Sequence, residues 1–152
     1  RELSGAFFTM EGDKAYLLKL KEMFEGFGNT VETIRAEDKV RYHAAAAMAS
    51  NLYVGLVSLC EDLLCGCGFS AENAHTALSP LIRGNTENIV NYGTEKALTG
   101  PVERNDTATV RKHLSELSGE SRDVYRVLSK QVLKVAKRKH PEQDYTIMEG
   151  EL

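Results

Sequence analysis

A lysine and a histidine stand four residues apart, at Lys39 and His43, where a stretch rich in apolar residues begins. On an α-helix this spacing separates two side chains by about 40° around the axis, so both lie on one face. Ser50 returns to that face, and Asn51 lies roughly 80° from His43. A lysine can donate a proton or a hydrogen bond to a substrate oxygen, and a histidine can act as an acid or base near neutral pH. Such groups on an apolar helix are costly unless they meet water, a ligand or a partner, so they are candidates for a site.

The same pattern has a simpler interpretation, and spacing alone favours it. Lys39 is then a solvated residue in the first helical turn, and His43 is a hydrogen-bonded residue at the edge of the core. The surroundings of this helix face decide between the two interpretations.

A second group of candidates lies between Ser79 and Asp106, where turn-forming residues stand beside hydrogen-bonding side chains. Loops on rigid scaffolds often carry binding groups. Arg83 or Arg104 can clamp a carboxylate through two parallel hydrogen bonds, and Thr99 opens a Gly-Pro turn between them. Ordinary loop chemistry and surface ion pairs account for the same residues if no substrate binds.

The composition is that of a globular domain, with 152 residues, 42% of them hydrophobic, and a net charge of −3. A nucleic-acid surface needs clustered cations, and the one basic cluster, at residues 130–139, stands at a helix end where cations complement the helix dipole. Cys60, Cys65 and Cys67 are odd in number and lack the spacing of a disulfide framework or a zinc site. We expect reduced thiols on a buried helix end, in a cytoplasmic protein.

The first part of the chain predicts a strand, a helix and a second strand. Ser4–Met10 holds an apolar and aromatic run, Asp13 can cap the helix that follows, and Thr30–Arg35 alternates as a strand does. One such βαβ unit needs further strands and cover on both faces. This indicates a unit cut from a larger α/β domain. The start at Arg1 rather than at an initiator methionine indicates a chain that either was processed or is a fragment.

The region after residue 35 predicts helices only. The first helix runs to about Cys67 and is apolar on nearly every face, which is typical of a helix surrounded by others. Its uncharged run from His43 to Cys60 is long enough to raise the question of a membrane span. Ser50, Asn51 and Ser58 interrupt that run, so a buried core helix is favoured.

The later helices are marked by caps and breakers. Ser70 can cap a second long helix that Pro80 should kink or split, and Gly93–Asn105 is irregular with one helical turn. Asp106 caps the next helix. A last helix spans Ser121–Lys139, with inward-facing Val124, Val127, Leu128, Val132 and Val135.

A dinucleotide fingerprint is matched by letters at Gly66–Ala71. That fingerprint works only between a strand and a helix, and here it follows a helix, so it predicts a helix-to-helix turn.

Three motifs, taken in order, resemble a family of Rossmann-type oxidoreductases that pair an N-terminal NAD(P)-binding domain with a helical C-terminal domain of unknown function. The motifs are Asp38–Ala46 continuing to Asn51, Pro80–Gly84 with Asn88, and Ala97–Asp106 leading to Thr109–Leu114. The resemblance covers about residues 1–135. It implies that residues 1–36 are the last βαβ unit of the Rossmann domain, that residues 37–140 form a helical substrate and dimerisation domain, and that residues 141–152 are a loose tail.

The helical part is similar in plan to the C-terminal domains of 6-phosphogluconate dehydrogenase and the β-hydroxyacid dehydrogenases. Those domains commonly dimerise through long helices and close the substrate site against the cofactor domain. The β-hydroxyacid dehydrogenases place a catalytic lysine four residues before an asparagine, after a glycine-containing turn. Here Lys39 is followed by His43, and no glycine precedes it, so the resemblance carries the role of Lys39 by position alone.

The expected fold class is therefore mainly α, a helical bundle of the 6-phosphogluconate-dehydrogenase C-terminal type after a short βαβ remnant of a Rossmann domain. The resemblance implies the substrate-binding and dimerisation part of an NAD(P)-dependent oxidoreductase whose substrate the sequence does not name. NADP or NAD is expected to bind the full-length parent, and this fragment alone is expected to be inactive and to bind no cofactor tightly.

Seven residues are expected to form the site. Lys39 and His43 face the nicotinamide cleft as catalytic residues, with Asn51 nearby, and the substrate-binding residues are Ser50, Arg83, Thr99 and Arg104. The alternative function is a non-catalytic helical dimerisation or ligand-binding module. Under either interpretation we expect a cytoplasmic homodimer that binds neither nucleic acid nor membrane and no metal ion.

Overall fold

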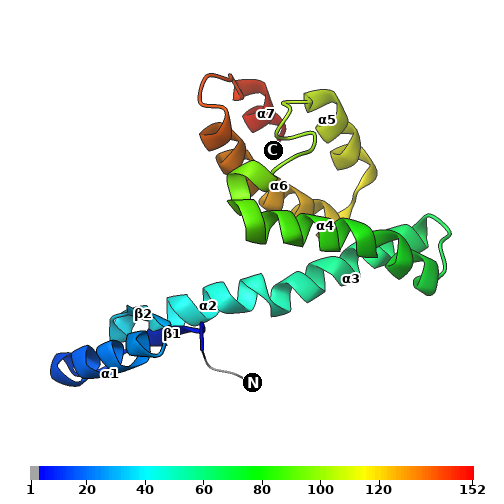
Figure 1. Cartoon of the computed structure of the whole chain (residues 1–152). Coiled ribbons are helices and arrows are strands. Elements are labelled where there is room, and N and C mark those ends of the chain that lie inside the picture. Colours follow the sequence, from blue (N-terminus) through cyan, green and yellow to red (C-terminus); the bar gives the residue numbers. More distant parts are fainter. Residues whose placement is uncertain (1–3) are drawn as a thin grey trace. The chain divides into compact units, whose positions relative to one another are not determined.

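A computed structural model describes residues 4–152, which are mainly helical with one pair of parallel strands near the N-terminus (Figure 1). This confirms the expected fold class, a helical domain that follows a short βαβ unit. The chain divides into two compact units, residues up to Ser58 and residues from Leu59 to Leu152.

The N-terminal unit opens with the predicted βαβ arrangement, formed by β1 (Phe7–Met10), α1 (Lys14–Gly26) and β2 (Thr30–Thr33). The strands are parallel, with Phe8 opposite Val31. Asp13 caps α1, its carboxylate accepting the Ala15 amide at 2.9 Å, as its position before the helix predicts. The core is small because a single helix covers the sheet. Only Val31, 2% exposed, is a fully buried apolar residue of this unit among those described.

Asn29 ties the two ends of the βαβ unit together. It is 8% exposed, its side-chain oxygen accepts the Ala6 amide at 3.0 Å, and its side-chain nitrogen donates to the Phe24 carbonyl at 3.1 Å. The amide group thus pairs the Ala6 amide before β1 and adds a further donor to the Phe24 carbonyl, which also accepts the Phe27 and Asn29 amides. It therefore sets where β1 begins relative to the end of α1.

The predicted long helix is present but broken at Ser50. A 3-10 turn (Ala36–Asp38) leads into α2 (Lys39–Ala49), and α3 (Asn51–Gly66) follows. Ser50 has φ −122° and ψ −79°, and its hydroxyl donates to the Ala46 carbonyl at 2.7 Å. A serine that bonds back to the carbonyl four residues earlier often bends a helix.

The expected burial of this helix is wrong for the described structure, since no residue of α2 or α3 is buried. Within the N-terminal unit the strand pair and α1 pack on each other. This unit therefore has little apolar surface left with which to cover α2 and the start of α3. Among the described residues, Ala36–Gly66 is the one helical stretch whose length and apolar composition would suffice to cross a membrane.

The three cysteines are free, as expected, but they are not all buried. Cys65 and Cys67 are exposed where α3 ends, while Cys60 is half-buried. Burial, and then the neighbouring Glu61 carboxylate, raise the pKa of the Cys60 thiol. The helix-to-helix turn after α3 is confirmed, because Gly68 takes φ +94° and the Ser70 hydroxyl accepts the Asn73 amide at 3.2 Å to cap the next helix.

Helix α4 (Ala71–Ala97) is interrupted at Gly93 and not at Pro80. Proline removes one amide donor, but helix α4 continues through Pro80. Gly93 takes φ +79° and ψ 170°, which lies outside helical geometry and suits glycine. The residues that follow form the single helical turn that the sequence predicts before the loop.

The core of the C-terminal unit is formed by the loop after α4 and by α5 (Thr107–Glu116), α6 (Gly119–Lys139) and α7 (Thr146–Glu151). Figure 1 shows α7 lying near α5 and α6. The buried cluster consists of Val102, Val110, Leu114, Leu133, Ala136, Tyr145, Met148 and Leu152. The loose tail expected for residues 141–152 is therefore wrong, because this segment contains a helix and three core residues.

The buried face of α6 also differs from the expected one. Ser129, Leu133 and Ala136 are buried, whereas Val127 and Leu128 are 66% and 41% exposed. Helix α6 carries apolar residues on more than one face, and α7 covers the face that the valine pattern did not select. The valine pattern was misleading because it ignored the small residues Ser129 and Ala136, which allow close packing.

Candidate functional site

In the N-terminal unit, Lys39 lies against Glu11. The Lys39 ammonium stands 2.6 Å from a Glu11 carboxylate oxygen, and the two side chains are 64% and 31% exposed. Glu11 directly follows β1, and Lys39 opens α2 shortly after β2. In parallel α/β sheets, ligands bind beyond the carboxyl ends of the strands. The structure thus places Lys39 at the edge of the strand pair where chemistry is expected.

Two arginines extend this edge. Arg35 and Arg41 both contact Asp38, with nitrogen-to-oxygen distances of 2.6 Å and 3.1 Å. Their side chains are 71% and 85% exposed, so solvent screens these pairs strongly. With Lys39 and Glu11, the edge holds three cations and two carboxylates. Such a surface can attract an anionic group and offer it ammonium and guanidinium hydrogen bonds.

The other candidates of this unit are not gathered around Lys39 by any contact between the described residues. His43 is exposed, and its side chain makes no hydrogen bond or ion pair within residues 4–152. The interpretation of His43 as a hydrogen-bonded boundary residue is therefore wrong. The Ser50 hydroxyl donates to the Ala46 carbonyl, and Asn51 is the first residue of α3, after the break at Ser50.

The remaining candidates lie in the C-terminal unit. Arg83 is exposed within α4 rather than in a loop, and Thr99 is exposed in the loop that follows. Arg104 is exposed in the same loop, and its backbone amide donates to the Gly100 carbonyl at 3.1 Å. In the described part of this unit, no side-chain hydrogen bond joins these three residues to one another.

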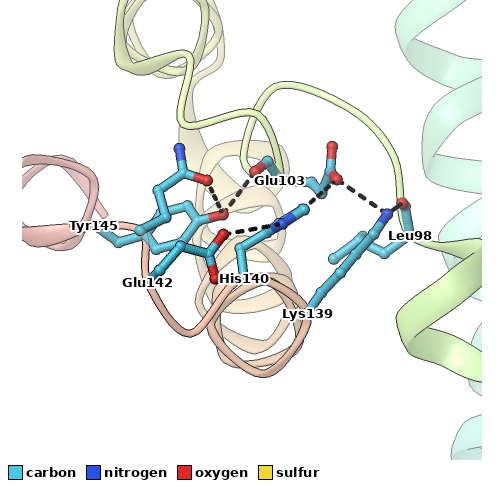
Figure 2. Close-up of polar contacts among 7 residues, drawn as sticks. Leu98, Glu103, Lys139, His140, Glu142 and Tyr145 are labelled. Atoms are coloured by element: carbon cyan, nitrogen blue, oxygen red, sulfur yellow. Dashed lines mark hydrogen bonds and ion pairs between the residues drawn. The ribbon is translucent and has the colours of Figure 1, made fainter.

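A polar cluster that no sequence pattern predicted centres on Glu103 in the C-terminal unit (Figure 2). The Glu103 carboxylate lies 2.8 Å from the His140 Nε2 atom and 3.0 Å from the Lys139 ammonium, and its side chain is only 13% exposed. The hydrogen bond from His140, then that from Lys139, lowers the pKa of the Glu103 carboxyl. Lys139 also donates to the Leu98 carbonyl at 2.8 Å.

Tyr145 completes this cluster from the segment after α6. Its hydroxyl lies 2.7 Å from the Glu103 carbonyl and 3.1 Å from the Gln143 side-chain oxygen, both of which can accept its hydrogen. Burial first, and then Glu103 and Glu142, raise the pKa of the Tyr145 phenol. A surface hollow of about 260 Å³ lies beside it, lined by residues that include Lys137, His140 and Thr146.

One signal in the sequence points to this cluster, since Lys139 and His140 stand immediately before Pro141, which ends the helix. Their partner Glu103 is 37 residues away from His140, so no local pattern connects them. Within residues 4–152, no group of three metal-binding side chains is close enough to hold an ion. The cluster therefore offers hydrogen bonds and a buried carboxylate, and no metal chemistry follows from it.

Solved structures similar to this chain are longer than it. Protein TM1727 from Thermotoga maritima is 30% identical, with a TM-score of 0.74, over 88% of this chain and 54% of that one. The "putative NADP oxidoreductase BF3122" from Bacteroides fragilis is 22% identical, with a TM-score of 0.68, over 81% of this chain and 47% of that one. The chain thus spans about half the length of each, and the likeness shows that their folds agree over the shared part.

No protein of curated function matches the chain. Residues 6–132, in contrast, match the family model described as a domain of unknown function, DUF2520. This match includes both strands, Lys39 and Glu103, and it stops within α6. Since it covers most of the sequence, the chain belongs to the DUF2520 family.

Proposed function

We propose that this chain is the substrate-binding and dimerisation part of a longer NAD(P)-dependent oxidoreductase. The observation that carries the proposal is the position of Lys39, paired with Glu11 at the carboxyl edge of a parallel strand pair. The name of the similar Bacteroides fragilis protein, which mentions NADP, agrees with it. The substrate remains a small molecule of unspecified class.

The residues of this chain fit the nicotinamide end of the cofactor but not its phosphates. Dinucleotide phosphates need a glycine-rich turn between a strand and a helix, and the turn between β1 and α1, Glu11-Gly12-Asp13, has a single glycine. We therefore assign the phosphates to the half of the longer protein that this chain does not include. When bound, NADP or NAD supplies the exchange of a hydride with the substrate.

In this proposal Lys39 donates a proton or hydrogen bond to the substrate oxygen on which charge develops. Glu11 orients its ammonium, and His43, one turn further along α2, exchanges the proton with solvent. Ser50 and Asn51, at the junction of α2 and α3, would contact the substrate. For the C-terminal unit taken by itself we keep Arg83, Thr99 and Arg104 as proposed substrate-binding residues, with Arg83 or Arg104 able to clamp a carboxylate.

The division of the chain is part of this proposal too. Residues 1–36 would be the last βαβ unit of the dinucleotide-binding domain, and residues 37–140 the helical domain, of the same plan as 6-phosphogluconate dehydrogenase C-terminal domains. The exposed strand pair supports this, because a parallel pair with one covered face needs further strands.

We also propose a homodimer. Large apolar side chains of α2 and α3 are uncovered, among them Val40, Met48, Leu52 and Val54, which are 62% to 80% exposed. Large apolar side chains left exposed in such number are typical of an interface. Sedimentation equilibrium at micromolar concentration should give the dimer mass, whereas a monomer that also fails to bind lipid vesicles would contradict this part.

A non-catalytic binding module is the second candidate. It is favoured by the exposure of Lys39, at 64%, because catalytic lysines are usually desolvated. Under this alternative, neither NADPH nor NADH binds the longer protein.

The decisive experiment uses the longer protein. NADPH and NADH are titrated by calorimetry, and carbonyl compounds are then screened by the loss of NADPH absorbance. Lys39→Ala should lower turnover by about 100-fold or more, the usual contribution of a general acid. Lys21→Ala is the matched control, since Lys21 is a partly exposed lysine of α1 that is paired with the Glu25 carboxylate and lies outside this edge, and it should retain activity. Equal losses in both variants, or no cofactor binding, would overturn the proposal.

A further inference from the structure

The loop between α4 and α5, residues 98–106, depends on outside contacts for its conformation. The backbone bonds within it gather in its second half, where Arg104 donates to Gly100 at 3.1 Å, Asn105 to Val102 at 3.2 Å and Asp106 to Pro101 at 2.8 Å. Asn105 takes φ +58°, which is uncommon for a residue other than glycine. Such a loop holds one conformation only if neighbouring groups restrain it.

Those restraints come from residues 139–152, which we call the C-terminal clasp. Lys139 donates to the Leu98 carbonyl at 2.8 Å, Tyr145 bonds the Glu103 carbonyl at 2.7 Å, and Asn105 donates to the Asp144 carbonyl at 2.8 Å. The clasp thus contacts the start, the middle and the end of the loop. Figure 2 shows the contacts at Leu98 and Glu103.

Apolar contacts hold the clasp in place. Val102 of the loop is 5% exposed and belongs to the same buried cluster as Tyr145, Met148 and Leu152 of the clasp. The bonds to the Leu98 and Glu103 carbonyls therefore form in a partly desolvated setting, where each contributes more than on an open surface, while the bond to the Asp144 carbonyl is exposed. The clasp lies outside the family match, which ends at residue 132, while the loop lies inside it.

We propose that the C-terminal clasp is a conformational device that fixes the loop at residues 98–106, and that protonation of His140 tightens it. The inference stands independently of the proposed function. If that function holds, the clasp governs how Thr99 and Arg104, both in the loop, are presented.

The geometry of His140 gives the direction of the pH effect. Its Nε2 atom lies 2.8 Å from Glu103 in the loop, and its Nδ1 atom lies 3.9 Å from Glu142 in the clasp. A neutral imidazole donates from one nitrogen only, whereas an imidazolium donates from both. Protonation thus turns the contact with Glu103 into a charge-assisted hydrogen bond between the clasp and the loop, and it adds an electrostatic attraction to Glu142 within the clasp.

The other charged and titratable groups around His140 do not reverse this direction. The nearby cation Lys139 repels the imidazolium, but it is itself paired with Glu103. The groups that share the adjoining surface hollow with His140 are Lys137, Asp144, Tyr145 and Glu149. Lys137 is paired with Glu149 at 2.5 Å, and Asp144 adds a further negative charge.

Hydrogen exchange of the loop amides tests the proposal on the full chain, as protection factors that remove the intrinsic pH dependence. Glu103→Gln should increase exchange of the Arg104, Asn105 and Asp106 amides by about tenfold, the loss expected for one charged hydrogen-bond partner. The matched control is Glu95→Gln, which removes an exposed pair with Arg138 and should leave these amides unchanged.

The pH dependence of loop protection is tested with the variant His140→Gln. In the unaltered chain, loop protection should be several-fold higher at about pH 5.5 than at about pH 8, the range over which imidazoles change charge. The variant should show no such difference. Should Glu103→Gln unfold the chain, Tyr145→Phe, which keeps the ring in the core, must still loosen the loop. Loop exchange in Glu103→Gln or Tyr145→Phe equal to that in Glu95→Gln, or a pH effect that survives in His140→Gln, would overturn the proposal.

Discussion

Two lysine–glutamate pairs, one in each unit, have similar distances and different surroundings. Lys39 and Glu11 are 2.6 Å apart, with side chains 64% and 31% exposed, while Lys139 and Glu103 are 3.0 Å apart and only 26% and 13% exposed. Glu103 also accepts from His140, whereas Glu11 has no second side-chain partner among the described residues. Exposure and the number of partners, rather than distance, decide what each pair contributes. The first pair is free to engage a ligand, and the second holds the fold.

The largest expected effect is on the core of the C-terminal unit, to which Met148 belongs. Met148→Ala should lower the free energy of unfolding by about 2–5 kcal/mol, because it leaves a cavity under α7. Its exposed neighbour Ile147, at 68%, gives the control Ile147→Ala, which should change stability by less than about 1 kcal/mol. Urea denaturation followed by circular dichroism measures both, and similar values for the two variants would mean that α7 is not part of the core.

Removing each carboxylate in turn tests whether exposure decides how much a lysine–glutamate pair contributes to stability. Glu103→Ala should cost about 1–3 kcal/mol, because it leaves Lys139 and His140 without their partner in a half-buried setting. Glu11→Ala should cost less than about 1 kcal/mol, the usual value of an exposed pair. If the two variants have equal midpoints in urea, exposure is not the deciding quantity.

Acid should abolish the contribution of Glu103 to the free energy of unfolding. Since the pKa of this carboxyl is lowered in the folded state, its contribution to stability is complete above the usual glutamate range. It is lost as the pH falls through the folded value. The difference in unfolding free energy between the unaltered chain and Glu103→Gln should therefore shrink as the pH falls below about 4. A difference that persists in acid would assign the effect to packing.

The smallest effect is expected for Lys39. Lys39→Met should change the free energy of unfolding by no more than about 0.5 kcal/mol, since an exposed cation contributes little to stability. Thermal denaturation of this variant and of Lys139→Met should separate the two positions. A large loss in Lys39→Met would make Lys39 a structural residue and weaken its proposed role.

Sequence patterns predicted the features that local chemistry controls. Asp13, Ser70 and Asp106 cap their helices as their types and positions indicate, and the strand–helix–strand order was correct. Each of these features depends on bonds between residues two to five positions apart or on simple periodicity.

The features that sequence reasoning missed depend on distant partners. The hydroxyl of Tyr145 bonds a carbonyl 42 residues away, and α7 forms in a segment without apolar periodicity because its few apolar side chains fit an existing core. Likewise, the burial of Ser129 and Ala136 rather than Val127 follows from the shape of that core. Of the candidate site, the sequence located Lys39, but it had no means of pairing it with Glu11, which is 28 residues earlier.

The position of Tyr145 and Met148 in the core has a consequence for biosynthesis. During translation, Val102, Val110 and Leu114 leave the ribosome well before the residues that cover them. The C-terminal unit therefore passes through an interval in which its apolar residues are accessible to chaperones and to other nascent chains. Ribosome-bound chains arrested before and after residues 145–152 emerge should differ sharply in protease resistance, with the earlier ones cleaved within α5.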